Sequence, residues 1–123
     1  MQILDNEKIS TLIQIGFAGC TKGQIFQARR LFEGLLCANP EILGAKLGLA
    51  FSHLVVDDFA KADELLDELM TKYEHDADVK AMKVFSCALQ KQAEEAHAIA
   101  DLISPEDVSA YQLCQDSLKL LDR

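Results

Sequence analysis

The chain has 123 residues, half of them apolar and 7% aromatic, and its formal net charge is −8. This length suffices for one domain with a sizeable core and leaves no room for a second. Because an acidic protein repels phosphate backbones, the charge disfavours nucleic acid as a partner. The low content of glycine and proline, 6 and 2 residues, suits helices joined by short turns.

Apolar residues recur at helical spacing and predict seven helices along the chain. The first two are expected at about residues 6–20 and 24–38. The third, at about 40–55, should begin with Asn39 as its N-cap and Pro40 at its first position, where the missing N–H costs nothing.

The fourth helix is expected to start after Asp57 and Asp58, because acidic residues are favourable at a helix N-terminus. Its apolar residues are spaced to form one inward side. Its charged residues predict a solvated outer face, formed by Lys61, Asp63, Glu64, Asp67 and Glu68.

Three further helices complete the prediction. The fifth and sixth are expected at about 77–90 and 92–103. The last, at about 105–121, should have Ser104 as its N-cap and Pro105 at its first position.

Residues of similar kind recur 34 positions apart. Five series keep this interval: Ala28, Ala62 and Ala96; Phe17, Phe51 and Phe85; Ile13, Leu47 and Ala81; Ile25, Phe59 and Ala93; and Leu35, Leu69 and Ile103. Small residues are needed where helix axes pass closest, and large ones fill the gaps beside them. A period of about 34 residues is the tetratricopeptide length, in which each unit is a pair of antiparallel helices.

The residues of the first unit match the tetratricopeptide pattern position by position, at Leu12, Ile15, Gly16, Gly23, Ala28, Phe32 and Pro40. The second unit matches at Leu49, Ala50, Phe59, Ala62, Leu66 and Leu69 but has Glu74 in place of the closing proline. The third departs further, with Val84 for the glycine, Ala100 for the aromatic residue and an early Pro105. The chain therefore resembles the tetratricopeptide-repeat proteins.

This resemblance implies an all-α fold in a single domain spanning residues 1–123. Three helix pairs, at about 9–42, 43–76 and 77–104, would stack as a short right-handed solenoid. The helix at about 105–121 would cap the third pair, because the end of a repeat array must be sealed.

The sequence lacks the common catalytic and nucleotide-binding motifs. His53, His75 and His97 are far apart and have no second ligand at i+4, and the adjacent Glu94 and Glu95 point in different directions on a helix. We therefore expect no enzyme activity, no metal and no cofactor.

The cysteines and the apolar runs indicate in which cellular compartment the protein works, and they favour the reducing cytoplasm. Cys20, Cys37, Cys87 and Cys114 form no CxxC pair and sit in apolar stretches, which favours small buried thiols in a reducing compartment over a disulfide framework or metal site. No apolar run is long enough to cross a bilayer, and no signal-peptide pattern is present. We expect a cytoplasmic protein without membrane insertion.

In tetratricopeptide arrays the first helix of each pair lines a concave groove, and the resemblance places the groove here on apolar residues only. They are Ile13, Phe17, Cys20, Leu47, Phe51, Leu54, Ala81, Phe85 and Ala88. Better-known peptide receptors of the family carry Lys, Arg and Asn there to grip a carboxylate, so an acidic tail is disfavoured as ligand. A row of phenylalanines suits the apolar side of an amphipathic helix.

Size, acidity and an apolar groove resemble the small chaperones of bacterial type III secretion, in the class that serves the needle subunit or an early export component. The resemblance implies that the groove holds an apolar helix of a secreted, self-assembling protein and keeps it monomeric until export. Phe17, Phe51 and Phe85 would be anchors, with Ile13, Leu47 and Leu54 excluding water around them. A second small chaperone often stabilises the repeat chaperone in this class.

An alternative from another class is a self-associating scaffold or adaptor without an export role. The phenylalanines would then be core, covered by the last helix or by a second copy of the chain. A homodimer face could be supplied by Leu113, Leu118, Leu120 and Leu121.

Overall fold

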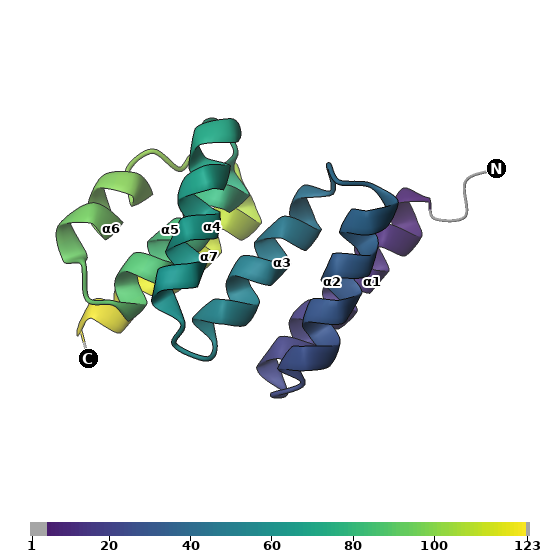
Figure 1. Cartoon of the computed structure of the whole chain (residues 1–123). Coiled ribbons are helices and arrows are strands. Elements are labelled where there is room, and N and C mark those ends of the chain that lie inside the picture. The colour runs from purple at the N-terminus through teal and green to yellow at the C-terminus, as the bar shows by residue number, and fades with distance from the viewer. Residues whose placement is uncertain (1–4, 123) are drawn as a thin grey trace. The chain divides into compact units, whose positions relative to one another are not determined.

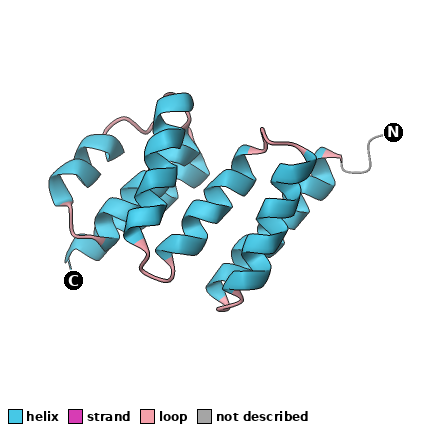
Figure 2. Cartoon of the chain, in the orientation of Figure 1, coloured by secondary structure: helices cyan, strands magenta, loops and turns pink. Residues whose placement is uncertain are grey.

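The computed structural model describes residues 5–122, which fold into seven α-helices, one short 3-10 helix and turns, with no strand among them (Figure 2). The predicted all-α class is therefore confirmed. None of these helices is both long and apolar enough to span a membrane. The described residues divide into two compact units, residues 5–58 and residues 59–122.

The first unit contains α1 (Asn6–Thr21), α2 (Ile25–Ala38) and α3 (Leu43–Leu54), and the antiparallel pair α1 and α2 is seen at the N-terminal end of Figure 1. Asp5 caps α1, because its Oδ1 accepts a hydrogen bond from the Lys8 N–H at 2.9 Å. Helix α3 packs against both α1 and α2. The buried core of this unit consists of Cys20, Ala28, Phe32, Leu35, Ile42 and Ala45.

The ring of Phe32 holds the three helices of this unit together. It is fully buried, and its tip lies directly against the Cα atoms of Gly16 on α1 and Gly48 on α3. A Cβ added at Gly48 would lie 2.6 Å from Phe32 Cε2, closer than real side-chain carbons approach. The two glycines therefore make room for the ring where the helices pass closest.

The second unit contains α4 (Phe59–Lys72), α5 (Ala77–Leu89), α6 (Ala93–Ala100), α7 (Val108–Lys119) and the 3-10 helix η1 (Leu120–Asp122). Helix α5 is central, since it contacts α4, α6 and α7. Asp76 caps α5 through a 3.0 Å hydrogen bond from the Val79 N–H to its Oδ1. The buried core combines small residues and thiols: Ala81, Val84, Cys87, Ala96, Ala100, Ile103, Ala110 and Cys114.

One turn geometry recurs at the 34-residue interval. Gly23, Asp57 and Lys91 all have left-handed backbone conformations, with φ of 82°, 60° and 61°. In each turn the following residue donates its N–H five positions back, over 2.8, 2.9 and 2.9 Å. These are repeated Schellman turns, which cap the last carbonyls of the preceding helix.

A polar contact between successive helices recurs at the same interval. Arg29 Nε on α2 donates to Ser52 Oγ on α3 at 2.9 Å. Thirty-four residues further on, Ser86 Oγ on α5 donates to Asp63 Oδ1 on α4 at 2.7 Å. The two serines occupy equivalent positions, while the partner changes from cation to anion.

Two predicted helix starts are wrong. Helix α3 begins at Leu43, because Asn39 Oδ1 accepts from the Glu41 N–H at 3.0 Å and so closes a local turn instead of capping a helix that starts at Pro40.

The second wrong start belongs to the last helix. Ser104 Oγ accepts a hydrogen bond from the Glu106 N–H at 3.2 Å. Pro105 therefore lies in a turn, and α7 begins at Val108. Helix α6 also ends at Ala100, three residues earlier than expected.

Candidate functional site

Two of the predicted anchor residues, Phe17 and Phe51, lie against one another in the first unit. Their ring centroids are 5.1 Å apart with an interplanar angle of 38°. Phe17 also contacts Phe32 edge-on, with centroids 5.6 Å apart and planes at 69°. Both anchors are half-buried, and the fully buried Phe32 supports the Phe17 ring from within.

Ile13 lies in the same α1–α3 contact. A Cβ at Gly44 would be 2.6 Å from Ile13 Cδ1, so the absence of a side chain at Gly44 admits the isoleucine. Ile13 is half-buried and packs against the core of the first unit, as do Phe17 and Phe51. We call Ile13, Phe17 and Phe51 the apolar surface of the first unit.

The other predicted groove residues differ in exposure. Phe85 on α5 is half-buried and belongs to the second unit. The remaining five are buried and supply packing instead of an accessible surface: Cys20, Leu47, Leu54, Ala81 and Ala88, at 3%, 6%, 1%, 0% and 0% exposure.

Sequence reasoning missed two polar networks. In the first unit, Arg29 reaches Ser52 and His53, and the His53 ring also contacts Asp58. The signal that could have found the Arg29 contact is the 34-residue interval itself, since it relates the Arg29 and Ser52 pair to Asp63 and Ser86.

The second network lies between α4 and α5. Asp63 accepts hydrogen bonds from Ser86, Gln90 and Lys83 at 2.7, 2.8 and 3.2 Å. The Lys83 ammonium, whose side chain is only 7% exposed, also contacts Asp67 at 2.9 Å. The prediction of a simply solvated α4 face is therefore wrong at Asp63.

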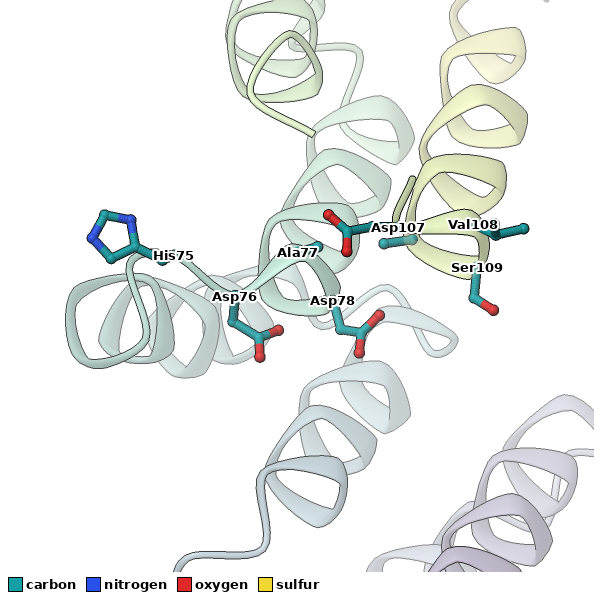
Figure 3. Close-up of a pocket in the computed structure, with 8 residues that line it drawn as sticks. His75, Asp76, Ala77, Asp78, Asp107, Val108 and Ser109 are labelled. Carbon is teal, nitrogen blue, oxygen red and sulfur yellow. The ribbon is translucent and has the colours of Figure 1, made fainter. Parts of the chain in front are cut away.

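An acidic pocket of about 420 Å³ lies where α5 and α7 begin (Figure 3). It is lined by Asp76, Asp78 and Asp107, with His75 at its edge. Burial, then the charges of Asp76 and Asp107, raise the pKa of Asp78. Asp76 is already engaged as the cap of α5, and residues 5–122 contain no group of three His, Cys, Asp or Glu side chains placed to hold a metal ion.

The four cysteines differ in exposure, so their reactivity tests the structure directly. Cys37 is exposed, and the other three are buried. Burial raises the pKa of the Cys20, Cys87 and Cys114 thiols, and that of Cys87 reaches about 11 with a further contribution from Glu95. We expect a chromogenic disulfide reagent to modify one thiol per folded chain rapidly and the other three only on unfolding. Cys37→Ser should abolish the rapid phase, whereas rapid modification of Cys20 would contradict this placement.

Neither a family model, nor a curated protein, nor a solved structure matches this chain.

Proposed function

We propose that this chain is a protein-binding chaperone that holds the apolar face of an amphipathic helix from a self-assembling partner. Its framework would be three tetratricopeptide-like helix pairs, stacked as a short solenoid and closed by α7. The recurring Schellman turns at Gly23, Asp57 and Lys91 support this arrangement. The equivalent contacts of Ser52 and Ser86 with the preceding helix support it as well.

The observation that carries the proposal is the contact between the tilted rings of Phe17 and Phe51. Half-buried aromatic rings fixed by neighbouring side chains make good binding anchors, because little rotational freedom remains to be lost on binding. With Ile13 they present aromatic and aliphatic surface without a charged group, which suits leucine-type side chains on one face of a helix. Phe85, half-buried in the second unit, would be an anchor within that unit.

The partner class rests on the resemblance to the small chaperones of type III secretion. We propose a secreted helical protein of a bacterial type III system, either the needle subunit or an early export component, bound in the cytoplasm before export. A second small chaperone would assist. The net charge of −8 supports a protein partner over nucleic acid.

The scaffold alternative is less favoured by the packing of the last helix. Three of the four leucines suited to a homodimer face, Leu113, Leu118 and Leu121, pack against the core of their own unit. The solution mass across a dilution series separates the alternatives. A tight dimer at all concentrations would favour the scaffold, and a monomer that aggregates without its partner would favour the chaperone.

The test begins with the protein isolated from its own cell under mild conditions and identification of what accompanies it. A helical segment of that partner, made as a peptide, is then titrated against the wild-type chain and two variants. Phe51→Glu should weaken binding by at least about 30-fold, because it places a charge among the anchors. Phe26→Glu, at a phenylalanine that is 69% exposed on α2, should leave it unchanged.

Stability measurements keep this test interpretable. Phe85→Ala should lower the free energy of unfolding less than Leu66→Ala, because Leu66 is fully buried and truncations there cost about 2 to 5 kcal/mol. If Phe51→Glu remains folded and binds the peptide as well as Phe26→Glu does, the proposed binding surface is wrong.

A further inference from the structure

Helix α7 packs on the second unit in a different way from α3 on the first unit. Helix α3 contacts both α1 and α2, and so bridges the helix pair that precedes it. Helix α7 lies along α5 and touches α6 at only a few points. A single helix, α5, therefore supplies most of the surface on which α7 rests.

The inward side of α7 is made of small residues. Ala110, Cys114 and Ser117 are buried and follow one another at helical spacing. The larger Tyr111 and Leu118 are only partly buried against the core of the unit. Because hydrophobic stabilisation grows with the apolar area that is buried, a contact of small residues holds a helix less firmly than large buried side chains would.

The Ser117 hydroxyl keeps its hydrogen bond if α7 moves as a helix. Its Oγ donates to the Leu113 carbonyl within α7, over 2.7 Å. A polar group that retains its partner adds no desolvation penalty when a neighbouring helix moves away. Helix α7 can therefore leave α5 and return without an unsatisfied hydroxyl on its inward side.

The two ends of α7 are held unequally. At the C-terminal end, Lys91 Nζ, from the turn after α5, donates to the Leu120 carbonyl at 2.6 Å. At the N-terminal end, Asp107 and Asp78 of α5 both line the acidic pocket (Figure 3). Burial raises the pKa of Asp78, and the charges of Asp76 and Asp107 raise it further. Attraction thus holds one end of the helix, while like charges repel at the other.

A hinge precedes α7. Ile103 is buried in the core of the unit, whereas the residues after it, 104–107, are exposed and lie outside the helices. Exposed residues lose little packing when their backbone rearranges. The segment 104–107 therefore allows α7 to move while α6 stays in place.

We propose that α5 carries a helix-binding face and that α7 is its built-in, displaceable occupant. The ligand class of this face is an amphipathic helix with small residues where α7 has Ala110, Cys114 and Ser117. The bond from Lys91 to the end of α7 sets how often the face opens. The inference concerns the second unit by itself, so it goes beyond the binding surface proposed for the first unit and is tested separately from it.

Hydrogen exchange of the full chain tests whether α7 opens by itself. Its amides should exchange faster than those of α5, because α7 opens without the rest of the unit. Lys91→Met should speed exchange in α7 about fivefold, the effect of losing one typical hydrogen bond, and leave α5 unchanged. Lys119→Met is the matched control, because Lys119 is exposed and pairs with Asp116 within α7, so both rates should stay nearly unchanged.

Binding of an added helix tests the face on α5. The probe is a fluorescent peptide of residues 104–119, which ends before Leu120 and so cannot use the bond from Lys91. Its affinity for the full chain, measured by fluorescence anisotropy, should rise about fivefold in Lys91→Met, because the competing α7 is open more often. The same peptide with Cys114→Glu should not bind, because it places a charge on the inward side.

Three results would overturn the proposal. One is that α7 and α5 exchange at the same rate and change together in Lys91→Met, since α7 would then open only when the whole unit unfolds. Another is that the peptide binds the wild type and folded Lys91→Met equally, or binds neither. The third is that the peptide with Cys114→Glu binds as well as the original. Circular dichroism of each variant verifies that the helices remain.

Discussion

Replacing Gly48 with Ala should lower the free energy of unfolding by about 1 to 3 kcal/mol, the usual range for overpacking a well-filled core. The added Cβ would meet three carbons of the Phe32 ring, which is fully buried and also lies against Gly16. The ring cannot withdraw, so the helices must separate or the side chain must leave its rotamer. Thermal or denaturant unfolding of the full chain measures the loss.

A glycine on a neighbouring helix provides the matched control. Gly34 lies within α2 and has no atom within 4 Å of a Cβ built on it. Gly34→Ala should therefore stabilise the protein by about 0.5 to 1 kcal/mol through helix propensity alone.

A second change tests the mechanism. Phe32→Leu replaces the ring with a smaller side chain. It should lower the free energy of unfolding less in the Gly48→Ala background than in the wild type, because the two sites are coupled. Equal effects of Gly48→Ala and Gly34→Ala would show that Phe32 does not fill the space between the helices.

A second large loss in the free energy of unfolding is expected from a substitution at Asp63, in the second unit. Asp63→Asn removes the charge that faces the buried Lys83 and turns an acceptor into a donor beside Ser86 and Gln90. Breaking a fully buried ion pair costs about 3 to 5 kcal/mol. Because the Asp63 side chain is 25% exposed and Asp67 remains as a partner for Lys83, we expect about 2 to 3 kcal/mol.

The pH dependence of this loss has a defined sign. Burial alone would raise the pKa of Asp63, but the hydrogen bonds from Gln90, Ser86 and Lys83 and the charge of Lys83 hold it below its ordinary value of 3.8. A carboxyl with a lowered folded-state pKa stabilises the fold above its unfolded pKa, and this contribution disappears as the pH falls through the folded pKa. The difference between wild type and Asp63→Asn should therefore be constant near neutral pH and shrink below about pH 4.

Lys83, the partner of Asp63, contributes to stability with the opposite pH dependence. Burial lowers its pKa, but hydrogen bonds and charge from Asp67 and Asp63 outweigh burial and raise the pKa above 10.5. Its contribution is complete below the unfolded pKa and is lost as the pH rises through the folded one. Glu64→Gln is the matched control, since the Lys61 and Glu64 pair is exposed and should contribute less than about 0.5 kcal/mol. A loss at Asp63 no larger than at Glu64 would contradict the network.

The sequence was sufficient to predict the helices and the burial of one series of small residues. Helical periodicity located all seven, and the series Ala28, Ala62 and Ala96 is buried at 4%, 0% and 0%, as small residues at close helix contacts should be. The ends were less predictable, because Asn39 and Ser104 satisfy nearby backbone groups in turns as readily as they cap helices.

The candidate site was only partly predictable for a related reason. Spacing placed Phe17 and Phe51 on corresponding helices, but only the structure brings the rings into contact and shows that Leu47 and Leu54 are buried. The polar networks were missed because charged residues on a helix are usually solvated. Whether Asp63 faces water or Lys83 depends on a helix that lies 20 residues away in the sequence.

The turns at Gly23, Asp57 and Lys91 share one backbone conformation although their residues differ. A left-handed backbone costs a non-glycine residue about 1 kcal/mol, yet the second and third turns keep it without glycine. The conformation is retained because it caps the helix ends. One helix-ending geometry is thus kept at three equally spaced positions that carry a glycine, an aspartate and a lysine.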